Sequence, residues 1–176
     1  MGSARRSITV LLFAALLASA VGCQREATGM AGTRTDRNKA LVRRWIEEGF
    51  NKRQLSVVDE LFAEHVAVNG QAIGRDGLKQ SMRRHLSGFP DLHVTINDIL
   101  AEENDVGIWY TVEGTHQGEF ETIPPTGKHV RWVGFDLVRL NGGKIFEARF
   151  LSDFFGLLTQ LGARVTLPSD RDVARP

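Results

Sequence analysis

The chain has 176 residues, with 22 Lys or Arg against 21 Asp or Glu, which gives a formal charge of +1 at neutral pH. It contains no basic block with interleaved aromatic residues, so the sequence argues against a nucleic-acid partner. The single cysteine excludes an internal disulfide, and the length allows one domain after the N-terminal segment.

The first residues have the features of a secretory signal. Two arginines precede an apolar run from Ile8 to Val21, which is too short for a comfortable membrane span. The run leads into AVGC, small residues that end in Cys23, and this resembles the lipobox at which bacterial lipoproteins are cleaved and lipidated. The alternative is an ordinary signal with a chance cysteine. We therefore expect a lipoprotein signal peptide at residues 1–22, a lipid on Cys23 and a polar tether at residues 23–36.

The predicted lipid would hold the mature protein at a membrane. Removal of residues 1–22 takes away two of the 22 basic residues and no acidic one, which leaves 20 against 21 and a formal charge of −1. Gln24 follows the cysteine in place of the acidic residue that, in lipoproteins, favours retention at the inner membrane. The sequence therefore predicts an exported protein anchored to the bacterial cell envelope, at the outer membrane or the cell surface.

From residue 37 the apolar pattern becomes helical. A first helix, capped by Asp36 or Asn38, carries one apolar stripe that includes Trp45, which we assign to the core or a pocket wall. A capping box that begins at Ser56 predicts a second helix. A third helix follows Gly74 and places on one face Leu78, Met82, Leu86 and His85.

Strand patterns follow the helices. Four apolar or alternating segments read as strands, at residues 93–100, 107–116, 129–140 and 144–152. Helices followed by antiparallel strands indicate an α+β fold, in which a strongly curved sheet folded around the helices would enclose a pocket. The apolar periodicity stops after Gly162, so we expect a domain at residues 37–162 and a flexible tail at residues 163–176.

One acidic residue, Asp136, stands in the apolar strand VRWVGFDLVRL. The period of two puts Trp132, Gly134 and Asp136 on the same face of that strand. An ionised, unpaired carboxylate in an apolar environment costs several kcal/mol, so Asp136 must be hydrogen-bonded, paired, protonated or open to a water-filled cavity.

The hairpin turn after this strand decides what lies opposite Asp136, and three turns are open. An Asn-Gly turn would place Glu147 there, a like-charge pair that is disfavoured. A Gly-Gly turn would place Arg149 there and form a salt bridge. A three-residue loop would place Ala148 there and turn Asp136 toward open space.

Five segments carry a family resemblance: FPDLHVTINDILAE, VEGTHQGEF, IPPTGK, GFDLVRLNGGKI and FFGLLTQLG. Together they resemble the SnoaL-like ester cyclases of the nuclear-transport-factor-2-like superfamily, over residues 38–162. The resemblance implies a cone-shaped α+β barrel with an apolar cavity, no metal and no organic cofactor. It also implies an aldol ring closure that uses a carboxylate as general base and acid, and homodimers formed through the open sheet face.

The resemblance also implies positions for the chemistry, and this chain departs from them. The strand after the NGGK turn usually bears a His-x-Asp pair, and Ala148 and Phe150 fall on those positions. The preceding strand usually bears a Gln-x-His pair, and Gly134 and Asp136 fall there. We therefore expect Asp136 to replace the missing acid/base group, in a pocket lined by Trp45, Trp132, His116, Gly134, Ala148 and Phe150.

His116 lies at the end of a predicted strand, where a role at the pocket mouth competes with a simply solvated surface histidine. None of the five histidines has the spacing of metal ligands, so we expect no metal site.

Two hypotheses about function follow. The first is an enzyme without a cofactor that carries out general acid/base chemistry, an aldol cyclisation or an isomerisation, on an apolar small molecule, with Asp136 as the base. The second is a lipid-anchored, non-catalytic module that binds a small molecule or a protein at the cell envelope. The missing family carboxylate and the predicted export favour the second, and the fold alone does not decide between them.

Overall fold

A computed structural model describes residues 32–164 of the chain. The predicted signal peptide, Cys23, most of the predicted tether and nearly all of the predicted tail lie outside the described residues. Within the described part, no helix is both long enough and apolar enough to cross a membrane.

The helical part begins with α1 (Arg34–Arg44), which continues without a break into the π-helical segment η1 (Trp45–Asn51). The cap is Thr33 rather than Asp36 or Asn38. The Thr33 hydroxyl accepts a hydrogen bond from the Asp36 amide at 3.2 Å, and the Asp36 carboxylate accepts one from the Thr33 amide at 3.1 Å. This capping box satisfies two backbone donors that would otherwise be free, so the helix starts at Arg34, inside the residues expected for the tether.

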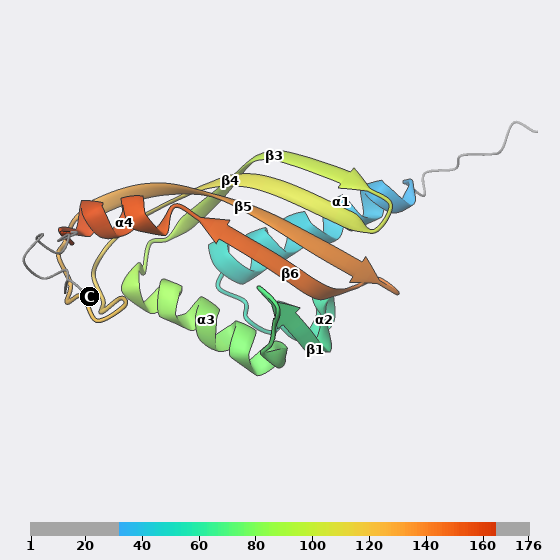
Figure 1. Ribbon diagram of the computed structural model, residues 1–176, viewed down its shortest axis with the longest axis horizontal. Coiled ribbons are helices and arrows are strands. Elements are labelled where there is room, and N and C mark those ends of the chain that lie inside the picture. Colours follow the sequence, from blue (N-terminus) through green and yellow to red (C-terminus); the bar gives the residue numbers. More distant parts are fainter. Residues whose placement is uncertain (1–31, 165–176) are drawn as a thin grey trace, which may run out of the picture. The chain divides into compact units, whose positions relative to one another are not determined.

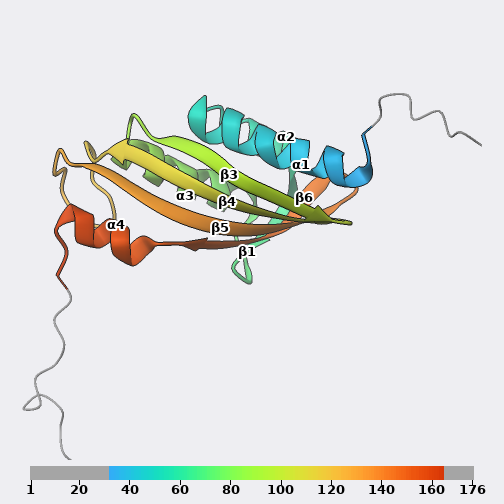
Figure 2. The same ribbon diagram turned by 90° about the horizontal axis from the view of Figure 1, so that it is seen from above.

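Two further helices precede most of the sheet. They are α2 (Val57–Leu61) and α3 (Gly74–Gly88). In Figures 1 and 2, α1 and α3 lie on one face of the sheet. Their buried side chains belong to the same hydrophobic core as the buried residues of the strands. The buried residues of α3 include Leu78 and Met82, which follow the predicted apolar stripe.

The sheet has six strands in the order β2-β1-β6-β5-β4-β3 (Figure 1). Their bounds are β1 (Phe62–Val68), β2 (Gln71–Ala72), β3 (His93–Glu102), β4 (Asp105–Thr115), β5 (His129–Asn141) and β6 (Lys144–Ser152). All neighbours are antiparallel except β1 and β6, which run parallel. The four predicted strands therefore pair antiparallel as expected, and the parallel pairing involves β1, which was not among the predicted strands. A last helix, α4 (Phe154–Leu161), follows β6.

Strand β5 confirms the predicted alternation, because its even-numbered residues from Val130 to Leu140 are buried. They face the helices and form the centre of the core. On the outer face, Trp109, Phe135 and Leu151 stand in one cross-strand row and are exposed.

The β5–β6 hairpin differs from all three predicted registers. Asn141 pairs with Lys144, so the turn consists of Gly142 and Gly143, both with positive φ angles of 56° and 76°. Such angles are those of the two-residue turns that match the twist of the strands. The register then shifts between Arg139 and Leu140 because β6 contains a bulge.

The bulge decides what lies opposite Asp136. The partner is Phe150, not Glu147, Arg149 or Ala148. The predicted salt bridge with Arg149 is therefore absent, and Arg149 lies 3.0 Å from Glu147 instead.

Candidate active site

Asp136 is the one buried carboxylate among residues 32–164, with 4% of its surface exposed. It projects from the middle of β5 into the space between the sheet and the helices. Its side-chain partner is Tyr110 on β4, whose hydroxyl donates a hydrogen bond to Asp136 Oδ1 at 3.0 Å. The carboxylate is therefore hydrogen-bonded, but no cationic side chain of residues 32–164 forms an ion pair with it.

The environment shifts the acidity of both partners. Burial raises the pKa of Asp136 to about 7, although the hydrogen bond from Tyr110 and the backbone amide of Leu151 act in the opposite direction. Burial and the adjacent carboxylate raise the pKa of Tyr110, so its hydroxyl keeps its proton and remains a donor. Near neutral pH, Asp136 is thus divided between a carboxylate and a carboxylic acid, the condition that general acid/base chemistry requires.

Gly134 allows the contact between Tyr110 and Asp136. Tyr110 and Gly134 are directly opposite on β4 and β5, and the tyrosine ring lies over the glycine. A Cβ atom on Gly134 would stand 2.4 Å from both the Tyr110 hydroxyl oxygen and its Cζ atom. Any larger residue would therefore push the phenol away from the carboxylate. Tyr110 is not among the site residues predicted from the sequence, although a glycine that faces inward on a central strand indicates an aromatic ring across the ladder.

A cavity of about 130 Å³ opens beside Asp136, between the helices and the sheet. Most of its wall is aliphatic or aromatic, and the polar side chains in the wall are those of Ser81, His85, Tyr110, Asp136 and Ser152. The other lining residues are Trp45, Ile46, Phe50, Leu78, Met82, Leu92, Val94, Val112, Trp132 and Phe150. The structure thus brings four of the predicted site residues together here: Asp136, Trp45, Trp132 and Phe150.

Aromatic rings form one wall of this cavity. Trp45 stacks on Phe150 with ring centroids 5.6 Å apart and an interplanar angle of 22°. It also lies 6.0 Å from Phe50, five residues further along the π-helical segment. The wider π-helical turn places residues five apart on the same side, so both rings face the cavity.

His85 on α3 lines the cavity; its position on the apolar helix face was predicted, but its place in the site was not. Its Nδ1 lies 3.0 Å from the carbonyl oxygen of Ser81, one turn earlier in the same helix. A carbonyl only accepts hydrogen bonds, so Nδ1 carries the proton in the neutral ring. Burial lowers the pKa of His85, which favours this neutral form at pH 7.

Three predicted pocket residues do not line the cavity. Gly134 lies beneath the Tyr110 ring, and Ala148 is buried opposite Val138. His116 is fully buried, so it is neither a residue of the cavity mouth nor a solvated one. Its Nδ1 accepts a hydrogen bond from the Thr126 amide at 3.2 Å, which ties down the loop between β4 and β5.

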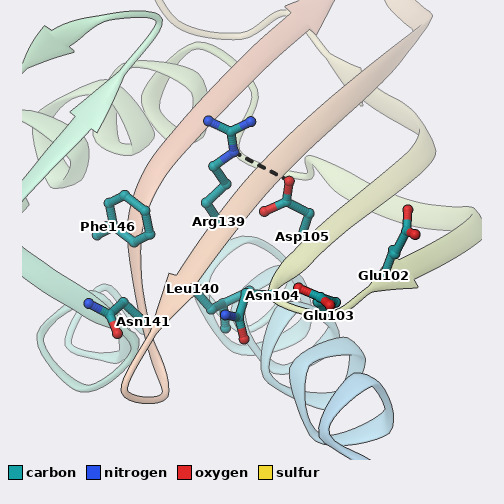
Figure 3. A pocket seen from close by; sticks show the side chains of 8 residues that line it. All are labelled: Glu102, Glu103, Asn104, Asp105, Arg139, Leu140, Asn141 and Phe146. Atoms are coloured by element: carbon teal, nitrogen blue, oxygen red, sulfur yellow. Dashed lines mark hydrogen bonds and ion pairs between the residues drawn. The ribbon is translucent and has the colours of Figure 1, made fainter.

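A larger hollow, of about 600 Å³, lies at the end of the sheet where β3 meets β4 and β5 meets β6 (Figure 3). It is lined mainly by charged and amide side chains, and Arg139 there lies 3.3 Å from Asp105. Arg139 also lies 3.2 Å from Glu147, so its charge is shared between two partly exposed carboxylates. Only Leu140 and Phe146 contribute apolar side chains to the hollow, and it holds no buried titratable group, so we place the candidate active site at Asp136.

No group of three or more His, Cys, Asp or Glu side chains within residues 32–164 is arranged to hold a metal ion. The site consists of a carboxylate, a phenol and an imidazole on apolar walls.

Comparison with known proteins agrees with this architecture. The family model of the SnoaL-like polyketide cyclases matches residues 40–161, and no curated protein matches the chain. A candidate SnoaL-like polyketide cyclase from Jannaschia sp. CCS1 is 23% identical, with a TM-score of 0.70 over 76% of this chain and 97% of its own. AclR from Streptomyces galilaeus, a candidate hydroxylase, is 29% identical, with a TM-score of 0.66 over 73% of this chain and 97% of its own.

IdmH from Streptomyces antibioticus, a candidate polyketide cyclase, is 26% identical, with a TM-score of 0.64 over 72% of this chain and 99% of its own. The predicted α+β fold, with a curved sheet around helices as in the nuclear-transport-factor-2-like proteins, is thereby confirmed. The family model covers more than half of the chain, and this chain belongs to the SnoaL-like polyketide cyclase family.

Proposed function

We propose that this protein transfers a proton at a carbon next to a carbonyl group in an apolar small molecule, as an isomerase or an aldol-type cyclase does. The observation that carries the proposal is the state of Asp136: a buried carboxyl on a cavity wall, held by one phenol, with its pKa raised to about 7. A group with this pKa is an effective base and, once protonated, an effective acid at neutral pH.

The proposed step uses Asp136 twice. Its carboxylate removes a proton from the carbon next to the carbonyl, and the electron pair moves into the enolate. The resulting carboxylic acid then returns the proton, to another carbon of the enolate system in an isomerisation, or to the alkoxide oxygen formed when the enolate carbon attacks a second carbonyl in an aldol closure. Tyr110 holds the carboxylate through Oδ1 and keeps its own proton, so it orients the base and does not compete for the substrate proton. The apolar wall excludes water that would otherwise solvate the carboxylate.

The position of Asp136 also explains how the site can function with Ala148 and Phe150 at the positions of the family's usual pair. Phe150 on β6 is directly opposite Asp136 on β5, and both line the cavity. A carboxylate on the neighbouring strand therefore reaches the same cavity that a side chain from β6 would reach.

The test measures hydrogen–deuterium exchange at the carbon next to the carbonyl group. A set of small ketones and aldehydes is incubated with the protein in D₂O, and the loss of the proton signal next to the carbonyl is measured by NMR. We expect at least one compound to exchange faster with the wild type than with Asp136→Asn, and Asp98→Asn, which alters an exposed carboxylate, to behave as the wild type. Equal exchange in wild type and Asp136→Asn would contradict the assignment.

A second candidate function is a non-catalytic binding module. It is favoured by Ala148 and Phe150, which put apolar groups where the family resemblance places an acid and a base. A compound that binds in the cavity and shows no exchange in the wild type would support this function over the first.

For either function we propose that the protein is exported and held at the cell envelope by a lipid on Cys23. The support is the apolar run that ends in AVGC. Fractionation of cells that express the full chain tests this, because Cys23→Ser should move the protein out of the membrane fraction. Unchanged membrane association would contradict a lipid anchor.

A further inference from the structure

The cavity presents different hydrogen-bonding groups on its two sides. On the sheet side, Asp136 and Tyr110 form the acid/base pair. On the helix side, the Nδ1–H of His85 donates a hydrogen bond to the Ser81 carbonyl oxygen. The other ring nitrogen, Nε2, makes no hydrogen bond within residues 32–164. A neutral imidazole held in this way offers only a lone pair. A ligand group that binds there must therefore bring its own proton, as a hydroxyl does.

The cavity contains no cationic side chain that would neutralise an anion. None of its lining residues is Arg or Lys, and His85 is neutral because burial lowers its pKa. A carboxylate, phosphate or sulfate group in this cavity would be desolvated without a counter-charge, and it would be repelled by ionised Asp136. The occupant is therefore uncharged.

The volume limits the size of the occupant. An apolar cavity of about 150 Å³ holds benzene, whereas sites for larger ligands measure about 300 Å³ or more. The Asp136 cavity, at about 130 Å³, has room for one ring or a short chain. It is too small for a molecule of several fused rings.

We propose that the cavity takes a neutral, single-ring or short-chain carbonyl compound with a hydroxyl group, and that His85 selects this compound by accepting the hydroxyl proton in a hydrogen bond. This inference rests on the proposed function, because it takes the Asp136 cavity as the substrate site. It goes further by naming the substrate class and assigning His85 a role in specificity.

The experiment measures binding with four probes and needs no turnover. Phenol is the matching probe, toluene lacks the hydroxyl, benzoate adds a negative charge and 1-naphthol adds a second ring. In NMR titrations of the wild type at slightly alkaline pH, we expect the dissociation constant of phenol to be about fivefold to tenfold lower than that of toluene. This difference corresponds to the free energy of one hydrogen bond. Benzoate and 1-naphthol should not bind in the cavity. Tighter binding of 1-naphthol than of phenol would overturn the size limit, and equal binding of phenol and toluene would overturn the role of the hydroxyl.

The role of His85 is tested by His85→Phe, which keeps a ring beside Phe120 and removes the lone pair. This variant should bind phenol about fivefold to tenfold more weakly and toluene as before. A second measurement uses the wild type, so it does not depend on whether His85→Phe folds. The nitrogen chemical shift of His85 Nε2 should change when phenol is added. An unmoved Nε2 signal at saturation with phenol would overturn the assignment of His85.

Asp136→Asn separates this inference from the proposed function. If the variant binds phenol normally and the wild type exchanges no proton on any carbonyl compound, the catalytic proposal fails and the ligand class stands. If exchange is found only with anionic or multi-ring compounds, the ligand class fails and Asp136 retains its catalytic role.

Discussion

The phenol ring of Tyr110 crosses the bare backbone of Gly134 and reaches the carboxylate of Asp136, two residues further along the same strand. The three residues act as a unit, because the glycine leaves the space through which the tyrosine donates its hydrogen bond. The strength of that hydrogen bond in turn influences how acidic Asp136 is.

Gly134→Ala should break this unit. The new Cβ would lie 2.4 Å from the tyrosine hydroxyl oxygen and 2.7 Å from its Cε2 atom, so the ring must move. We expect a loss of about 1–3 kcal/mol in the free energy of unfolding, measured with urea, and a reduced exchange rate. Gly107→Ala is the matched control on β4, since its Cβ would meet only the end of the Phe135 ring at 3.2 Å. It should cost less than about 1 kcal/mol, and equal losses in the two variants would refute the packing argument.

The sequence predicts much of the fold because the local patterns are strong. The turn residues before Lys144 and the strand pattern after it place β6 at its observed bounds, and the alternation in β5 puts Asp136 on the same face as Trp132. The spacing of Leu78, Met82 and His85 likewise puts them on one helix face, and all three line the cavity. These results depend only on turn residues and on the periods of strands and helices.

The site is less predictable because it depends on contacts between strands. The Gly-Gly turn is one of the predicted alternatives, but the bulge in β6 shifts the pairing and replaces Arg149 by Phe150 opposite Asp136. A bulge adds one unpaired residue to a strand, and no periodicity in the sequence indicates that β6 contains one. Tyr110 is 26 positions away from Asp136, and their contact follows from the β4–β5 register together with the glycine between them.

Tyr110→Phe should change the pH dependence of activity. The hydroxyl lowers the pKa of Asp136 by hydrogen-bonding its ionised form, against the stronger effect of burial. Without the hydroxyl the pKa should rise above its value of about 7. Exchange by the wild type should increase with pH through about 7 as the carboxylate forms, and the midpoint for Tyr110→Phe should lie at higher pH. A midpoint at or below that of the wild type would show that Tyr110 does not control the base.

The outer face of the sheet predicts self-association. Trp109, Phe135 and Leu151 form a row across β4, β5 and β6, and their exposed fractions are 45%, 40% and 72%. An apolar row of this kind is typical of a protein interface, and we propose that two copies pair through it. Phe135→Glu should shift the protein to monomer in sedimentation experiments, whereas Phe155→Glu, on helix α4, should leave the assembly unchanged. A wild type that is monomeric at all concentrations would exclude the dimer.

Asp136→Asn should stabilise the fold above neutral pH while it removes activity. Because the folded-state pKa of about 7 exceeds the ordinary value of 3.8, the native state holds a proton that the unfolded state has already lost between these pH values. Wild-type stability should therefore fall as the pH rises from about 4 to about 7, and the full penalty is about 4 kcal/mol.

Asparagine avoids that penalty and still accepts the hydrogen bond from Tyr110, although its amide group needs a partner of its own. We expect the variant to be more stable than the wild type by about 1–4 kcal/mol at pH 8 and to lose this advantage near pH 4. Urea unfolding at several pH values measures the difference, with Asp98→Asn as the exposed control. A variant that is less stable than the wild type at pH 8 would show that the carboxylate supports the fold, whereas a more stable and inactive variant would show that the chain retains a destabilising charge at its catalytic site.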